Sequence, residues 1–193
     1  METKPSPRPL EVALLASVFV IAACGLVYEL AAGALASYLL GDSVLQFSTV
    51  IGSYLFAMGI GSYLSRFFER QLPAHFLRIE LLVALIGGAL PALLFIANAY
   101  VPGAFRFLLY SLVLLVGTLV GLEIPLVMRI LRRNVALKDL VSQVLTFDYQ
   151  GGAGGVTCFS AGVGAAAGLD SYRLAVWADE CCCGGVGAVA LQA

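Results

Sequence analysis

The sequence predicts an all-α fold, a polytopic membrane helix bundle with four transmembrane helices and an irregular C-terminal tail. Apolar residues make up 61% of the 193 residues and charged residues 12%, against roughly half and a quarter in an ordinary soluble domain. A soluble fold of this size has too little interior to bury so much apolar surface. The apolar residues also gather into four long runs with at most one charge each, which is typical of membrane-spanning helices.

Each of the four runs is long enough to cross a bilayer, which takes about 20 apolar residues. Because an open strand would leave its backbone groups unpaired in lipid, each run is predicted to be a helix. The first run has 29 residues, which is more than one crossing requires at about 1.5 Å per residue, so we expect it to tilt or to project into the interface. The runs cover residues 12–40, 43–65, 81–105 and 107–128.

The basic residues predict the orientation of these helices. The loops after the first and the third runs lie on one side of the bilayer, and they contain a single basic residue, Arg106. Arg173 lies in the tail. Because basic residues favour the cytoplasmic side, we expect the N-terminus and the segment after Met128 to be cytoplasmic. The nine residues on that side are Lys4, Arg8, Arg66, Arg70, Arg78, Arg129, Arg132, Arg133 and Lys138.

Four segments follow from these patterns. Residues 1–11 are expected to be a cytoplasmic N-terminal segment, and residues 12–131 a four-span membrane domain. Residues 132–149 alternate apolar and polar side chains as an amphipathic helix does, so we expect them to lie along the cytoplasmic face. Residues 150–193 are expected to form an aberrant or disordered tail.

Composition and motifs exclude several classes of function. The net charge of −1 provides no basic field to hold nucleic acid. The five cysteines do not form a disulfide scaffold, because Cys24 and Cys158 are isolated and the other three are adjacent. His75 is the single histidine and has no cluster of cysteines or carboxylates around it. We therefore predict no catalytic residue, no metal site and no cofactor in this chain.

Glu29 is an ionisable residue inside the first run, next to Tyr28, and such residues are functional candidates by default. Gly25 and Gly33 lie four residues on either side of it, so small residues share its helix face and favour a tight helix contact. We expect Glu29 to point into the bundle with Tyr28 beside it. A structural carboxyl group, a site for a ligand or proton, and an interfacial position all remain open.

Glu123 is the second intramembrane candidate. Pro125 cannot donate a hydrogen bond to the Gly121 carbonyl, so the helix is expected to kink there and to free an acceptor. A carboxyl group beside a broken turn can form a polar pocket, as in transporters, but a structural role or a place near the cytoplasmic interface is equally compatible. The helix-packing candidates are Gly25, Gly33, Gly61, Gly117 and Gly121, of which Gly117 and Gly121 do not share the face of Glu123.

Several motifs together resemble a known family. They are GLVYE at residues 25–29, GIGS at 59–62, GLEIP at 121–125 and LTFDY at 145–149. In this order they resemble the membrane-embedded N-terminal region of bacterial spermidine synthase-like (polyamine aminopropyltransferase) proteins. The resemblance covers residues 12–150 and implies a multi-pass protein of the bacterial inner membrane.

In that family, the membrane region precedes a soluble Rossmann-like domain. The resemblance implies that this domain binds decarboxylated S-adenosylmethionine and transfers an aminopropyl group to putrescine. No strand–helix–strand unit follows the membrane part here, so no catalytic or cofactor-binding residue of the family has a counterpart to name. This chain is therefore expected to be inactive by itself.

The sequence changes character after Tyr149. Its glycine-rich residues 152–155 follow a helix and lack a trailing Lys-Ser/Thr, so they do not form a phosphate-binding loop. Read one base later, the codons of Cys181 to Cys183 give alanine or valine, and those of residues 177–180 can give a membrane-helix segment. We expect a truncation or frameshift near residues 150–155, with poorly ordered or weakly helical structure beyond it.

Three functions are compatible with these observations. The first is the membrane portion of a spermidine synthase-like protein. The second is a small transporter or permease subunit for polyamines or other cations, with Glu29 and Glu123 facing the cation. The third is an anchor or scaffold whose basic segment 129–138 meets anionic lipid or a partner. The expected partners are the lipid bilayer and either further copies of the chain or a soluble aminopropyltransferase domain, but not nucleic acid.

Overall fold

The computed structural model describes residues 9–68, 71–132 and 137–166. Within these ranges all the regular secondary structure is helical, which confirms the predicted class of secondary structure. Two short 3-10 helices, η1 (Ser65–Phe67) and η2 (Pro102–Ala104), connect longer elements. The α-helices are α1 (Pro9–Leu40), α2 (Ser43–Leu64), α3 (Leu72–Tyr100), α4 (Phe105–Leu131) and α5 (Leu137–Ala166).

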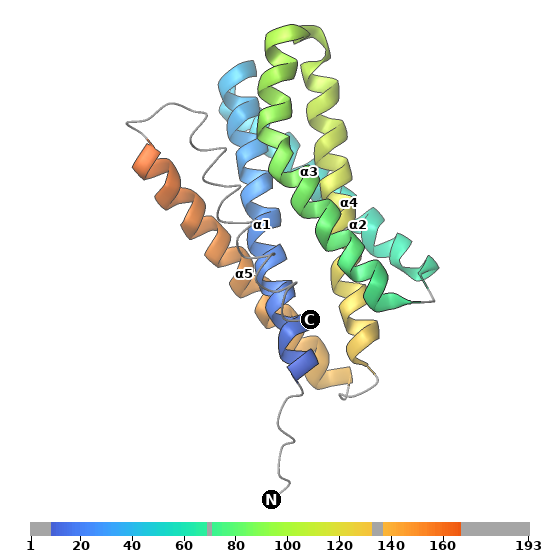
Figure 1. Ribbon diagram of the computed structural model, residues 1–193. Helices are drawn as coiled ribbons and strands as arrows, with labels where there is room; N and C mark the ends of the chain where they lie inside the picture. Colours follow the sequence, from blue (N-terminus) through green and yellow to red (C-terminus); the bar gives the residue numbers. More distant parts are fainter. Residues whose placement is uncertain (1–8, 69–70, 133–136, 167–193) are drawn as a thin grey trace, which may run out of the picture.

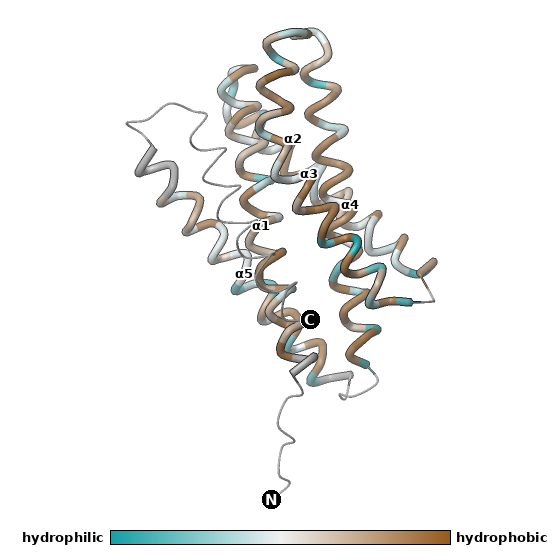
Figure 2. The backbone as a smooth tube through the Cα atoms, in the orientation of Figure 1, coloured by the Kyte–Doolittle hydropathy of each residue, from teal (hydrophilic) through white to brown (hydrophobic). Residues whose placement is uncertain are grey.

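Four of these helices are long and apolar enough to cross a membrane, as judged by length and composition. They are α1 to α4, and the segments that qualify are Val12–Leu40, Ser43–Phe67, Leu72–Tyr100 and Phe105–Leu131. Apolar residues dominate these helices, whereas α5 alternates more between apolar and polar residues (Figure 2). The helices alternate in direction from α1 to α4, and α5 starts at the same end of the bundle as α1 (Figure 1).

A tight turn joins α1 to α2. Gly41 has a φ angle of 73° and Asp42 one of 48°, both in the left-handed region that favours glycine and tolerates aspartate. The Asp42 carboxylate accepts a hydrogen bond from the Leu45 amide at 3.3 Å and caps the start of α2. The turn therefore reverses the chain within two residues, so that α2 can pack back against α1.

Helix α3 begins nine residues before the start predicted from the apolar run and ends before residue 105. Pro73 lies in its first turn, where a missing amide proton costs nothing. Phe76, Ile79 and Val83 are buried at helical spacing and extend the core-facing stripe toward the N-terminus of α3. As a result, Glu80 lies inside this helix and is 6% exposed, although a loop was expected at that position.

Glycines set the distance between α2 and α4. A Cβ atom on Gly61 would collide with the backbone oxygen of Thr118, and one on Gly121 would collide with the backbone of Met58. A Cβ atom on Gly117 would lie 2.9 Å from that of Ala57. The backbones can approach this closely only because side chains are absent, which is how membrane helices gain packing contacts.

Helix α5 departs from the predicted boundaries. It continues through residue 150 to Ala166, where a poorly ordered or weakly helical tail was expected, and it packs along α1 (Figure 1). A Cβ atom on Gly151 would collide with the Phe19 carbonyl oxygen, and one on Gly155 would lie 3.0 Å from the Ala23 Cα. These glycines, one turn apart, allow the two helices to lie in parallel contact. The expectation for residues 167–193 lies outside the described residues.

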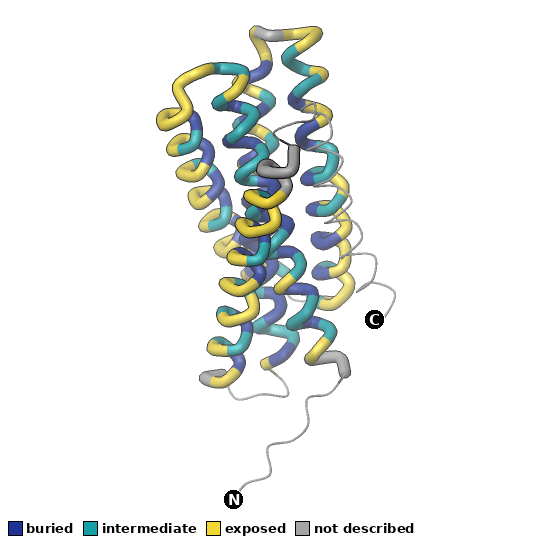
Figure 3. The backbone as a smooth tube through the Cα atoms, turned by 90° about the vertical axis from the view of Figure 1, so that its left-hand side faces the viewer, coloured by how far each residue is buried: buried dark blue, intermediate teal, exposed yellow. Residues whose placement is uncertain are grey.

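The outer face of the bundle is apolar. Buried residues lie on the sides where the helices face one another, and exposed residues line the outer sides (Figure 3). Large apolar side chains are among the exposed ones, including Leu55 at 60%, Phe56 at 66% and Leu85 at 69%. A surface of this kind is costly in water and matches the apolar exterior that lipid requires.

Candidate functional site

Acidic side chains on three helices lie near enough to one another to interact electrostatically. Glu80 comes from α3, Glu123 from α4 and Asp148 from α5, and Glu123 interacts electrostatically with both of the others. Glu123 is 3% exposed and Glu80 is 6% exposed, whereas Asp148 is half-buried. We refer to Glu80, Glu123 and Asp148 as the acidic cluster.

Tyr54 connects the acidic cluster to Glu29. This tyrosine is buried on α2 and interacts electrostatically with Glu29, Glu123 and Asp148. Its hydroxyl oxygen lies 2.9 Å from the position that a Cβ atom on Gly25 of α1 would occupy. The absence of a side chain at Gly25 therefore leaves the room that the tyrosine hydroxyl fills. Together, the five helices each contribute one member of this polar region.

The carboxyl groups of the acidic cluster are incompletely paired. The Ser17 hydroxyl donates a hydrogen bond to Glu80, but the Oε1 atoms of Glu80 and Glu123 are buried without a hydrogen-bond partner in the described part of the chain. In the same ranges, no lysine or arginine forms an ion pair with a member of the cluster. Arg129 instead donates to the Ser65 carbonyl oxygen at 2.9 Å.

Burying several acidic side chains in this way costs free energy. A buried carboxyl group without a partner would lose its hydration on ionising and gain little in return, and ionised neighbours would repel one another. Ionisable groups at membrane depth are therefore associated with ion and substrate paths or with proton relays. Among the described residues, no three histidine, cysteine, aspartate or glutamate side chains are placed to hold a metal ion.

The structure places the predicted candidates in different surroundings. Glu123 belongs to the acidic cluster. Glu29 is half-buried and interacts electrostatically with Tyr54. Tyr28 is 2% exposed, and its ring occupies the space left by Gly87 of α3. Sequence neighbours on α1 therefore differ in role, because Tyr28 fills a gap between helices whereas Glu29 belongs to the polar region.

The five glycine candidates lie at helix contacts. Gly25 contacts Tyr54 and Val120, and a Cβ atom on Gly33 would lie 2.8 Å from the Phe47 ring of α2. The other three, Gly61, Gly117 and Gly121, lie between α2 and α4 as described above.

Sequence reasoning missed Glu80, Asp148 and Tyr54. Glu80 was assigned to a loop because the third apolar run was started one residue after it. Asp148 was read as part of a surface helix, although it follows the buried residues Leu140 and Val144 at intervals of four and so shares their face. The same spacing from Val50 places Tyr54 on the buried stripe of α2, which is the signal that could have found it.

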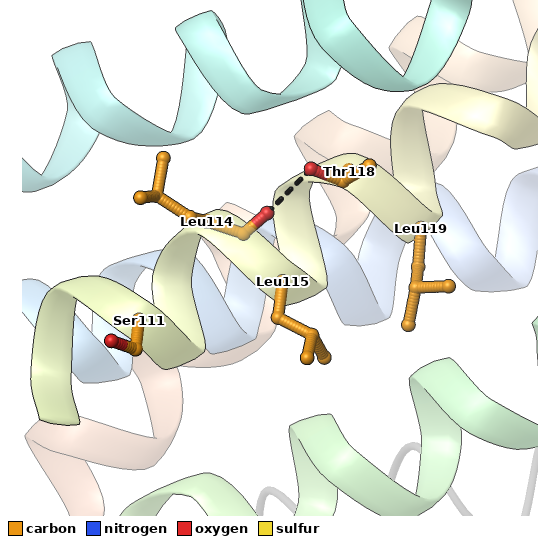
Figure 4. A pocket seen from close by; sticks show the side chains of 5 residues that line it. All are labelled: Ser111, Leu114, Leu115, Thr118 and Leu119. Atoms are coloured by element: carbon orange, nitrogen blue, oxygen red, sulfur yellow. Dashed lines mark hydrogen bonds between the residues drawn. The ribbon is translucent and has the colours of Figure 1, made fainter. Parts of the chain in front are cut away.

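A groove on the outer side of α4 is a weaker candidate. In Figure 4 it is lined by Ser111, Leu114, Leu115, Thr118 and Leu119. The Thr118 hydroxyl donates its proton to the Leu114 carbonyl oxygen at 2.7 Å within the same helix, so it has no donor left for a ligand. The groove presents no charged group, and its apolar lining matches a surface in contact with lipid.

We compared the chain with known protein families, curated proteins and solved structures. No family model matches the chain, and no solved structure matches it significantly. The chain is 58% identical over 151 residues to polyamine aminopropyltransferase 1 of Ralstonia nicotianae, which covers 76% of this chain and 29% of that protein. It is 61% identical over 140 residues to polyamine aminopropyltransferase 2 of the same organism, which covers 72% of this chain and 28% of that protein.

A second organism also has a similar protein. The polyamine aminopropyltransferase of Leptospira interrogans is 51% identical over 142 residues, covering 74% of this chain and 28% of that protein. The chain thus spans less than a third of the length of these relatives. Over about three quarters of its own length, this chain is homologous to proteins named polyamine aminopropyltransferase, which supports the spermidine synthase-like relationship that its motifs suggested.

Proposed function

We propose that this chain is the membrane-embedded portion of a polyamine aminopropyltransferase-like protein in a bacterial inner membrane. The observation that carries the proposal is that its similarity to three such proteins, at 51–61% identity, is confined to less than a third of their length. In this chain the matched share is large enough to include most of its four apolar helices. The lipid bilayer is then its first partner.

In this proposal, the domain that transfers the aminopropyl group lies outside these residues and is the second partner of the bundle. The described residues contain no strand, and the relatives are more than three times longer than the region they share with this chain. We expect the purified chain to transfer no aminopropyl group from decarboxylated S-adenosylmethionine to putrescine. Measurable transfer would overturn this assignment.

The nucleotide sequence of the gene tests the frameshift hypothesis. We propose that the reading frame changed near residues 150–155, so that genomic DNA downstream of codon 150 encodes an aminopropyltransferase in another frame. Resequencing across the junction in independent clones decides the matter, because an intact frame in all of them removes the hypothesis. The continuous helix to Ala166 is compatible with either result, since a shifted frame can still encode helix-forming residues.

The proposed orientation, with a cytoplasmic N-terminus, is open to a direct test. In a variant with all five native cysteines replaced, single cysteines are introduced at Val44 and Gly103 on one side and at Ala74 and Arg132 on the other. We expect a membrane-impermeant maleimide to label intact cells only at Val44→Cys and Gly103→Cys, because the basic residues favour a cytoplasmic position for the other side. The reverse pattern would show that the orientation is inverted.

A second candidate function is transport of polyamines or other cations by an oligomer of this chain. It is favoured by the carboxyl groups that several helices place inside the bundle without a basic partner among the described residues. We expect proteoliposomes to take up labelled putrescine, and Glu29→Gln to abolish uptake. Asp139→Asn, which alters an exposed acid in the first turn of α5, is the matched control. No uptake by the unmodified chain would instead favour a plain anchor, and uptake that is unchanged in Glu29→Gln would show that Glu29 takes no part in transport.

A further inference from the structure

We infer that the outer face of α2 binds one acidic phospholipid, whose headgroup phosphate lies on Arg66 and Arg129. The inference rests on the first function proposed above, because it requires the bundle to lie in a bilayer. It goes further by assigning a class of lipid and the residues that hold its headgroup.

The first support is the way Arg66 is held at the end of the second apolar segment. Its guanidinium carbon lies 4.0 Å from the centre of the Tyr63 ring and 4.8 Å from the centre of the Phe67 ring. The two rings contact each other edge to face, with their centroids 6.5 Å apart. Stacking on an aromatic ring uses the face of a guanidinium and leaves the N–H donors along its edge available.

These N–H donors have no use within the described part of the protein. There, Arg66 forms neither a hydrogen bond to a protein acceptor nor an ion pair with a carboxylate, and its side chain is exposed. A planar guanidinium can donate to two oxygens of one phosphate at once. An exposed arginine that two rings hold in place is therefore a pre-organised phosphate ligand.

The second support is a second guanidinium from another helix. Arg129 of α4 donates from Nη1 to the carbonyl oxygen of Ser65 at 2.9 Å, and Ser65 directly precedes Arg66 in the chain. Two positive charges thus lie at the C-terminal end of α2, and neither forms an ion pair within the described ranges. This charge attracts an acidic lipid and disfavours a lipid whose headgroup also carries an ammonium group.

The third support is an apolar path that leads from these arginines along the outside of α2. Gly52, Phe56, Gly59 and Tyr63 recur at helical spacing and are all exposed. Nothing lies within 4 Å of the position that a Cβ atom on either glycine would take. At about 1.5 Å per residue the path is roughly 16 Å long, close to one leaflet, which is half of a hydrocarbon core of about 30 Å. Its length therefore matches the acyl chains of one lipid.

The combination of charge and apolar path favours a phospholipid over other occupants of this face. Free phosphate would use the arginines and leave the path uncovered. A second copy of the chain, packed in parallel across a two-fold axis, would bring the two arginine pairs together at the same depth of the bilayer. Like charges placed so close would repel each other. A lipid supplies the opposite charge and the apolar chains in one molecule.

Lipid titration of the purified, delipidated chain in detergent tests the inference, with native mass spectrometry to count the bound molecules. We expect one phosphatidylglycerol to bind at least tenfold more tightly than phosphatidylcholine with the same acyl chains. Arg66→Gln and Arg129→Gln should each weaken this binding at least tenfold. Arg106→Gln is the matched control, because it removes one exposed positive charge at the start of α4 and should leave the affinity unchanged.

Far-UV circular dichroism and thermal unfolding establish that each variant is folded. If Arg129→Gln unfolds because it loses the bond to Ser65, Arg66→Gln still decides, since Arg66 forms no hydrogen bond to the described protein. Arg66→Lys keeps the charge but not the planar donor edge, so we expect it to bind more weakly than the wild type and more tightly than Arg66→Gln.

Three results would overturn the inference. They are equal affinities for the two lipids, wild-type affinity in folded Arg66→Gln, and displacement of the lipid by an equimolar amount of inorganic phosphate. A chain dimer that excludes the lipid would also overturn it, in favour of a second copy on this face. The labelling of the four single-cysteine variants tests membrane insertion separately, so a chain that inserts without this lipid preference would contradict the inference alone.

Discussion

Replacing Gly61 by alanine is expected to destabilise the contact between α2 and α4 by about 2 kcal/mol, since overpacking a tight contact costs roughly 1–3 kcal/mol. The added Cβ atom would meet the Thr118 carbonyl oxygen, which belongs to the backbone of α4 and cannot rotate away. The helices must separate, and the contacts at Gly117 and Gly121 then loosen as well. The loss is measured as a lower midpoint of thermal unfolding in dodecylmaltoside.

Gly59→Ala is the matched control for Gly61→Ala, two residues earlier on the same helix. Nothing lies within 4 Å of the position that its Cβ atom would take, because this side of α2 faces outward. Alanine also favours a helix over glycine by roughly 0.5–1 kcal/mol, so we expect no loss of stability. Equal unfolding midpoints for the two variants would contradict the described packing of α2 against α4.

Replacing Gly151 by alanine is expected to loosen α5 from α1. The new methyl group would meet the Phe19 carbonyl oxygen on α1, again a backbone atom that cannot move by itself. An overpacking cost of about 1–3 kcal/mol corresponds to a roughly tenfold to hundredfold change in a local opening equilibrium. Hydrogen exchange of the amides in α5 should accelerate accordingly, while exchange in α2, α3 and α4 should change little.

Gly154→Ala separates this effect from a general effect of alanine in α5. At that position the nearest atom is the Phe19 Cζ at 3.7 Å, an ordinary van der Waals distance at the end of a side chain. We expect the exchange rates of this variant to match those of the unmodified chain.

Local sequence patterns were sufficient for the helical class of the fold, and they singled out Glu29 and Glu123 as candidates. Long apolar runs specify helices in lipid because a helix pairs its backbone groups within one segment, whereas an open strand leaves them unpaired. The run around Glu29 and the run around Glu123 each contain one charge, which makes these residues visible without any structure. The ends of helices were harder to predict, since the start of α3 depends on Pro73 and on a buried stripe that begins within a polar segment.

The glycine-rich stretch after Tyr149 illustrates the opposite case. Its residues gave no periodic apolar signal, so they were read as a break in the helix. In the structure, Gly151 and Gly155 contact α1 and the helix continues. A small residue at a close contact is stabilising only when a second helix lies against it, and that partner is more than 100 residues away in the sequence.

The sequence by itself determined that the chain is helical, apolar on its outside and able to cross a membrane four times, because these properties depend on composition and on the periodicity of neighbouring residues. Only the tertiary structure decided that Glu123 lies near enough to Glu80 and Asp148 to interact electrostatically, and that Tyr54 interacts with Glu29 as well as with Glu123 and Asp148. The physical reason is that electrostatic interaction depends on distance in space, and the packing of five helices brings together residues that are far apart along the chain.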